Sequence, residues 1–423
     1  MNAAGEWSEV TEAMAVPSDV LRAVRRTVDK WRDRVVDLSR VLISIPSLSG
    51  QEGDVAKALS RAMDELGYDE VRVDEVGNVI GTVHGVSRSP GVVLNGHMDT
   101  VPPADMDKPF RPEVVEGSVF GGRGLAITGR GACDMKGPLA AMVLAGAVFK
   151  EIGMRPARDF VVSAVVLEEV GGSIGSSHLI RSGIRGKLAI IGEPTSLRVN
   201  LGHRGSVHMD ITTFGKAAHA STPEVGENAI YLMAPVIEAI EHLNHRLPEH
   251  PFLGKATVAA CDIDAFPGVR NVVPSACRLS VNFRTVPKMD EAAVISLLKE
   301  TLGRVFAEQS DRWKVDMAFN EGSTYTGRPF RTPKVMRGYW CEPSGAGFAA
   351  LASAVQAATG RDAEVGFWRF STDGPCFFLD GGMPAYGFGP GDETVAHSST
   401  EHVLVGDLLA ACVTYALLGI LVT

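Results

Sequence analysis

The sequence lacks the cysteine pattern of a zinc ribbon or of a disulfide framework. Its six cysteines are scattered over 423 residues, and no two of them form a Cys-x-x-Cys pair. Because thiols stay reduced in the cytoplasm, this usage favours a cytoplasmic location. The N-terminus also lacks a basic stretch followed by an apolar one, so we expect no secretory signal.

An excess of positive charge and a long apolar run are missing as well. Lys and Arg number 41 against 50 Asp and Glu, which gives a formal net charge of −9. Binding to nucleic acid or to an anionic membrane requires basic patches, so we expect neither partner. The most apolar stretch, residues 408–423, is shorter than the ~20 residues that a membrane-spanning helix needs. We interpret it as a buried terminal helix.

Strand and helix patterns alternate along the chain and predict an α/β protein with a mainly parallel central sheet. The rhythm changes between residues 200 and 312, where the order of elements indicates a small α+β unit. We therefore predict a discontinuous catalytic domain, residues 1–199 and 313–423, with an inserted domain, residues 200–312.

Acidic and histidine residues directly follow several of the predicted strands. In an open α/β sheet, ligands bind at the carboxyl ends of the strands, so these side chains are expected to meet there. Two further candidates lie in loops, one of them directly before a helix. The complete set is His97, Asp99, Asp134, Glu168, Glu169, Glu193 and His397.

This set combines imidazole and carboxylate donors without a thiol, which suits Zn²⁺, Mn²⁺ or Co²⁺. Its donors exceed the four that one tetrahedral zinc ion requires, whereas two ions that share a bridging carboxylate would use them all. Of the adjacent Glu168 and Glu169, one would bind metal and the other would act as a free base. Asp99 would accept the second N–H of His97 and so orient that ligand.

Eight segments stand in an informative order and spacing. They read NGHMDTVPP, GRGACDMKGPLAAM, LEEVGG, IGEPT, GKAAHASTPEVGENAI, RNVVPSACRLSVNFR, FSTDG and GPGDETVAHSSTEHV. Together they resemble the metal-dependent aminoacylase and carboxypeptidase family, which includes acetylornithine deacetylase, succinyl-diaminopimelate desuccinylase and glutamate carboxypeptidase. The resemblance runs from about Val35 to the C-terminus.

The resemblance implies a zinc-peptidase-like catalytic domain with two metal sites that share Asp134. His97 and Glu193 would complete one site, and Glu169 and His397 would complete the other. The implied cofactors are two divalent ions, with Zn²⁺ as the first expectation and Co²⁺ or Mn²⁺ as alternatives.

The resemblance also implies catalytic roles outside the metal ligands. Glu168 would be the general acid and base, and Asp99 would orient His97. The inserted domain would be a ferredoxin-like lid that pairs two subunits. Its His219 would reach the active site of the partner subunit and stabilise the oxyanion, so a homodimer is expected.

Substrate binding is expected at further positions that match the family. Arg284 and Asn271 match positions that bind a substrate carboxylate, and Arg204 is an additional candidate because an Arg fork suits a carboxylate. A structural ion pair is the alternative role for Arg284. The loop residues expected to line the pocket are Ser371, Thr372 and Gly374.

These implications predict a metallohydrolase that cleaves the amide bond of a small N-acylated amino acid. A dipeptidase or carboxypeptidase and an N-carbamoyl amidohydrolase remain alternatives within enzymes. A non-catalytic metal-binding scaffold is the alternative from another class. The turn of residues 121–134 is longer than is usual in the family, and residues 328–345 and 367–374 differ in sequence from the housekeeping deacetylases.

Overall fold

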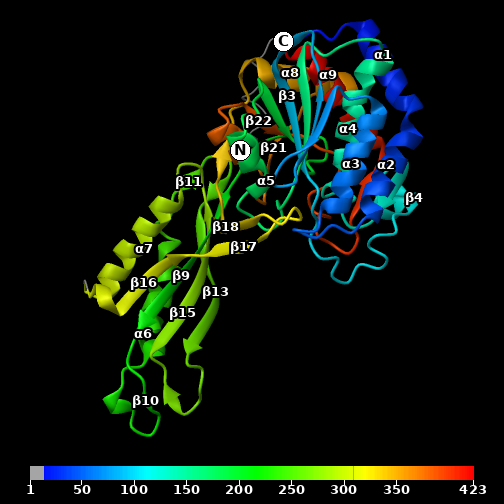
Figure 1. Ribbon diagram of the computed structural model, residues 1–423. Coiled ribbons are helices and arrows are strands. Elements are labelled where there is room, and N and C mark those ends of the chain that lie inside the picture. The colour runs from blue at the N-terminus through cyan, green and yellow to red at the C-terminus, as the bar shows by residue number, and fades with distance from the viewer. Residues whose placement is uncertain (1–13, 308) are drawn as a thin grey trace.

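The computed structural model describes residues 14–307 and 309–423 (Figure 1). A larger α/β domain is built on a nine-stranded sheet, and an elongated smaller domain on a five-stranded sheet. Each sheet has its own buried apolar core. The predicted α/β class is confirmed. The first thirteen residues of the predicted catalytic domain lie outside the described residues.

A mixed sheet forms the centre of the larger domain. In spatial order its strands are β1 (Glu70–Val73), β2 (Val79–Val83), β6 (Arg158–Val165), β3 (Ser87–His97), β7 (Leu188–Ile191), β22 (Ala385–Gly387), β8 (Val199–His203) and β20 (Tyr339–Trp340), and β21 (Val365–Trp368) pairs with β8. The strands from β6 to β22 run parallel, whereas β1, β2 and β20 pair antiparallel with their neighbours. The parallel arrangement thus holds at the centre, and a short turn, residues 74–78, forces β1 and β2 to be antiparallel.

Helices pack against this sheet. The helices α4 (Lys136–Glu151) and α9 (Val405–Leu421) contact each other and the strands β3 and β6. Because α4 carries mostly small or apolar side chains on every face, nearly its whole length is buried. The other helices of the domain are α1 (Ser18–Lys30), α2 (Arg32–Ser44), α3 (Gly53–Leu66), α5 (Ile174–Arg181) and α8 (Gly345–Thr359).

The C-terminal helix α9 is buried, as its apolar sequence predicts. No helix within residues 14–307 and 309–423 has both the length and the apolar character needed to cross a bilayer. A three-stranded sheet of β4 (Val114–Glu116), β5 (Leu125–Thr128) and β23 (His402–Leu404) lies at the edge of the domain.

The smaller domain is an antiparallel sheet covered by two helices. In spatial order the strands are β13 (Thr257–Phe266), β15 (Ala276–Thr285), β9 (Gly205–Phe214) and β16 (Trp313–Met317), and β19 (Val335–Met336) also pairs with β9. Burial alternates along β9 and β15, which is typical of a sheet with one covered face. The helices α6 (Ala229–Leu243) and α7 (Glu291–Val305) cover that face, and the short strands are β10 (Ala218–His219), β14 (Val272–Val273), β11 (Glu249–His250) and β12 (Gly254–Lys255).

The second sheet extends beyond residue 312, at which the sequence prediction ended the inserted domain. Both β16 and β19 pair with the edge of β9. Without them, β9 would present an unpaired edge to solvent. The chain changes from one sheet to the other between β8 and β9 and again between β19 and β20.

A hairpin of β17 (Phe319–Ser323) and β18 (Pro329–Pro333) interrupts the second sheet between β16 and β19. It is drawn in yellow in Figure 1, where it reaches from the smaller domain to the larger one. We call it the bridging hairpin below.

Candidate metal centre

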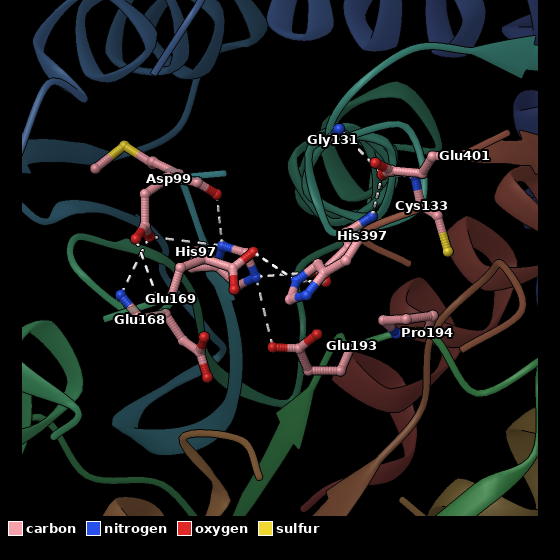
Figure 2. A network of polar contacts seen from close by, with 12 residues as sticks. His97, Asp99, Gly131, Cys133, Glu168, Glu169, Glu193, Pro194, His397 and Glu401 are labelled. Atoms are coloured by element: carbon pink, nitrogen blue, oxygen red, sulfur yellow. Dashed lines mark hydrogen bonds and ion pairs between the residues drawn. The ribbon is translucent and has the colours of Figure 1, made fainter. Parts of the chain in front are cut away.

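The candidate metal ligands gather where the central parallel strands end (Figure 2). His97 is the last residue of β3, and Glu169 and Glu193 follow β6 and β7 within a few residues. Asp134 lies directly before α4, and His397 lies in the loop after β22. The edge of the sheet that the sequence pointed to therefore does bring these five residues together.

Asp134 stands between two histidines. Its Oδ1 lies 2.8 Å from Nε2 of His97, and its Oδ2 lies 3.1 Å from Nε2 of His397. Oε1 of Glu193 lies 3.6 Å from Nε2 of His97, and Oε1 of Glu169 lies 3.1 Å from Nε2 of His397. Two groups of three donors result, each with its ligand atoms within 4.8 Å of one another. Each group could hold a metal ion, and Asp134 belongs to both.

The electrostatics of the centre favour added positive charge. Burial, together with the charge of Asp134, raises the pKa of Glu193 well above its ordinary value and raises that of Glu169. Hydrogen bonds to Asp134 and Glu169 raise the pKa of His397 to about 10. Carboxylates crowded in a buried site need a cationic partner to offset their desolvation, and two divalent ions would supply one. The donor set therefore fits such ions.

Glu168 is the one acid of the adjacent pair that lies outside both donor groups. Its side chain is buried, and within the described residues its Oε1 has no hydrogen-bond partner. Burial and the charge of Glu193 raise the pKa of Glu168 well above its ordinary value. Because it also lines a cavity beside the metal ligands, this carboxylate can receive a proton from a molecule bound there.

Asp99 holds the backbone that carries Glu168 and Glu169. Its carboxylate accepts the N–H of each of these two residues at 3.1 Å and the hydroxyl of Ser49 at 2.7 Å. The Nδ1 of His97 is 2.8 Å from the backbone oxygen of Asp99 but 3.6 Å from its Oδ1. Of the two Asp99 groups, the backbone carbonyl is thus the closer one to Nδ1 of His97, whereas the sequence analysis predicted the carboxylate.

Glu401 fixes the loop of Asp134 and was missed by the sequence reasoning. Its Oε1 accepts the N–H of Gly131, Cys133 and Asp134 at 2.9–3.0 Å. Its Oε2 pairs with Arg130, and both side chains are buried. A buried acid four residues after His397, inside the last recognised segment, was the available signal.

A cavity of about 380 Å³ lies beside the centre and is lined by both domains. Glu168 and His397 face it from the larger domain, and Arg284, Lys334 and His208 face it from the smaller one. Burial, with the nearby charges of Lys334 and Arg284, lowers the pKa of His208 to about 4. The smaller domain therefore contributes two cations and a histidine that favours its neutral form to the lining of the cavity.

Of the predicted substrate-binding residues, Arg284 and Ser371 line this cavity. The guanidinium of Arg204 instead donates to the backbone oxygen of Lys255 at 3.0 Å. The N–H of Thr372 donates to Nε2 of His203 at 2.9 Å, and Thr372 is fully buried.

Gly374 has a packing role. A Cβ on this residue would lie 2.4 Å from the hydroxyl oxygen of Tyr339, so the close approach of the ring requires glycine.

His219 and Asn271 lie far from the metal centre of their own chain. Strand β10, which ends at His219, stands at the end of the smaller domain that points away from the larger one (Figure 1). The backbone N–H of Ala220 donates to the oxygen of Asn271 at 2.9 Å, so the two residues are neighbours there. We call this region the distal tip.

Comparison with known proteins identifies relatives of this chain. The model of a family described as peptidase family M20/M25/M40 matches residues 93–419. The Escherichia coli K12 protein YgeY, described as uncharacterized, is 30% identical over 397 residues, which cover 92% of this chain and 95% of YgeY. A succinyl-diaminopimelate desuccinylase of Pseudomonas syringae pv. syringae is 27% identical over 389 residues, 87% of this chain and 92% of that protein.

A solved structure shares the fold. The Bacillus subtilis YXEP protein, described as a dinuclear metal binding peptidase of the M20 family, superposes with a TM-score of 0.66. Its sequence identity is 14%, and the superposition covers 92% of this chain and 98% of that one.

Proposed function

The chain belongs to peptidase family M20/M25/M40 and is therefore a metal-dependent hydrolase of amide or peptide bonds; we propose that its substrate is a small N-acylated amino acid. The family resemblance inferred from the motifs is thereby confirmed. The observation that carries the proposal is the position of Asp134, which belongs to both histidine-containing donor groups. Beside them, Oε1 of Glu168 has no hydrogen-bond partner among the described residues.

In this proposal two metal ions share Asp134. His97 and Glu193 complete the first site, and Glu169 and His397 complete the second. We propose Zn²⁺, with Co²⁺ and Mn²⁺ as ions of similar ligand preference. When bound, such ions lower the pKa of a water molecule and polarise the substrate carbonyl.

Glu168 then acts as base and acid in turn. Its Oε1 takes a proton from the attacking water, and the new C–O bond forms at the amide carbon. The same carboxyl group next donates that proton to the leaving nitrogen as the C–N bond breaks. The products are a carboxylic acid and a free amino acid. A raised pKa suits this residue because it must hold the proton between the two steps.

The cavity supports a small anionic substrate. Its volume of about 380 Å³ lies at the lower end of the range of small-molecule sites. We propose that Arg284 binds the carboxylate of the amino acid, because it lines the same cavity as Glu168 and comes from the other domain. Lys334 is a second cation on the same wall.

We also propose that two chains form a dimer through the smaller domain. His219 and Asn271 are exposed at the distal tip, far from their own metal centre, and this position supports a role at the site of another chain. In the dimer, His219 of the partner subunit stabilises the oxyanion. The six free cysteines support the proposed cytoplasmic location.

A substrate panel tests this function. Protein reconstituted with Zn²⁺ is assayed on N-acetyl, N-succinyl and N-carbamoyl amino acids and on dipeptides, with an acidic and a neutral amino acid in each class. The highest kcat/KM is expected for an N-acyl amino acid. A clear preference for dipeptides or for N-carbamoyl compounds would replace the proposed substrate, and no turnover by protein holding two ions would favour the scaffold alternative.

A further inference from the structure

The bridging hairpin lies across loops of the larger domain, although the sheet it interrupts does not need it. The N–H of Lys334 donates to the oxygen of Ala318 at 2.8 Å and closes the base of the hairpin. The strand before the hairpin, β16, and the strand after it, β19, both pair with β9. We propose that the bridging hairpin holds the loop of Glu168 and Glu169 in its active form, with Asn320 as the positioning residue. This inference rests on the proposed role of Glu168.

The loop after β6 needs such support because its backbone is unusual. Leu167 and Ser173 adopt positive φ angles of 60° and 48°, and Gly171 and Gly172 adopt 75° and 87°. Left-handed conformations of residues other than glycine persist only where the surrounding contacts determine them. The catalytic pair is therefore carried by a segment that does not keep this shape through its own preferences.

Asn320 contacts this loop directly after the catalytic pair. Its Nδ2 donates to the backbone oxygen of Val170 at 2.5 Å and lies 3.4 Å from that of Gly171. A Cβ added to Gly172 would lie 2.8 Å from Cγ2 of Thr332 on the other strand of the hairpin. Both strands of the hairpin thus contact residues 170–172.

The far end of the bridging hairpin is anchored on the turn between β1 and β2. The hydroxyl of Tyr325 donates to the oxygen of Gly77 at 2.9 Å, and the hydroxyl of Thr326 donates to the oxygen of Glu75 at 2.9 Å. Arg328 forms an ion pair with Glu75. A Cβ on Gly77 would lie 2.3 Å from the ring of Tyr325, so this close contact requires glycine.

The same turn forms hydrogen bonds with both ends of the loop that carries Glu168 and Glu169. Oδ1 of Asn78 accepts the N–H of Val166 at 3.1 Å, and its Nδ2 donates to the oxygen of Gly175 at 3.0 Å. Asp74 in turn accepts the Nδ2 of Asn78 at 2.8 Å. The hairpin therefore supports the loop twice, through Asn320 at its middle and through the turn at its ends.

A matched set of variants tests the inference by activity. Asn320→Asp keeps the shape of the side chain but removes its donor, and Asn320→Ala removes both. In both, kcat is expected to fall roughly ten- to a hundredfold, because a small displacement of a catalytic group is costly. KM should change less than twofold, and two metal ions should still bind. The control, Glu321→Gln, breaks an exposed ion pair with Arg331 in the same hairpin and should match the wild type.

A second readout does not depend on turnover. Hydrogen–deuterium exchange of peptides covering residues 166–173 should accelerate in both Asn320 variants and stay unchanged in Glu321→Gln. Unchanged exchange, or accelerated exchange with wild-type kcat, would overturn the inference. If the wild-type protein hydrolyses no substrate, the proposed function fails instead, and the exchange data alone then decide whether the hairpin holds the loop.

Discussion

The metal centre and the distal tip show opposite ways of presenting functional side chains. At the centre, His97, Asp134 and Glu193 are at least 94% buried, and the carboxylates of Glu401 and Asp99 accept the backbone N–H groups of Asp134 and Glu168. At the tip, His219 and Asn271 are exposed, and Nδ1 of His219 contacts the neighbouring Ser221. The centre is thus preorganised within one chain, whereas in the proposed dimer a second chain would complete the surface of the tip.

Of the changes that test this comparison, removal of metal should have the largest effect on turnover. Exhaustive chelation is expected to abolish turnover and to lower Tm, because the buried carboxylates lose their cationic partners. Activity should return with Zn²⁺ or Co²⁺. The measurement is turnover and Tm before and after dialysis against a chelator, followed by metal addition. Full activity in protein shown to be metal-free would refute the centre.

Glu168→Gln should have the next largest effect. Loss of the proton acceptor is expected to lower kcat by about three to four orders of magnitude, while two ions and the wild-type Tm are retained. Steady-state kinetics and metal analysis of the purified variant measure this. Wild-type kcat would refute the assignment of the base.

His219→Ala probes the distal tip. Loss of an oxyanion donor is expected to lower kcat by about 10²–10³ without a change in metal content. A mixture with Glu168→Gln then sharpens the test, because a hybrid dimer contains one complete site. After random exchange of subunits, about a quarter of the wild-type activity should return. No recovery in hybrids verified by mass would show that His219 does not act across subunits.

Glu401→Gln probes the support of the centre. The N–H groups of residues 131, 133 and 134 lose a charged acceptor, and buried Arg130 loses its ion pair. We expect metal affinity to fall about 10–100-fold, which is typical for residues that hold metal ligands in place. Competition with a chromogenic chelator measures it, and unchanged affinity would mean that the loop of Asp134 keeps its shape unaided.

The smallest effect is expected at the junction of the two domains. Burial lowers the pKa of His203 to about 4, below its ordinary value of 6.5, so the folded state favours the neutral ring. The associated stability is therefore complete above about pH 6.5 and is lost as pH falls towards 4. Between pH 7 and 5, wild type should lose about 2 kcal/mol more than His203→Gln in denaturant titrations. Equal losses would contradict this.

The sequence predicted the centre better than its supports. Apolar runs that end in His97, Glu168 or Glu193 can be read directly, because a strand delivers its last residues to one edge of the sheet. Asp134 and His397 lie in loops; the residue pattern made them candidates, and the resemblance implied which metal site each would join. The contacts of Glu401 and Asn320 could not be predicted, although Glu401 lies inside a recognised segment, since each side chain contacts the backbone of a segment more than a hundred residues away.

The limits of the smaller domain were harder to predict for a similar reason. Pairing of β16 and β19 with β9 joins segments about a hundred residues apart, and no local pattern records it. The bridging hairpin lies between these strands, and only its second strand, β18, falls in the stretch of residues 328–345 that departs from the housekeeping deacetylases. Sequence patterns therefore show which residues carry chemistry more readily than which residues hold them.

The strand order of the larger sheet also determines when the centre can form during synthesis. Strand β22 lies between β7 and β8, and every partner of β8 comes from residue 339 or later. A nascent chain that has just completed the smaller domain therefore exposes the edges of β7 and β8. The second donor group is complete only once His397 has emerged, so an ion at this group could bind only in the last stage of biosynthesis.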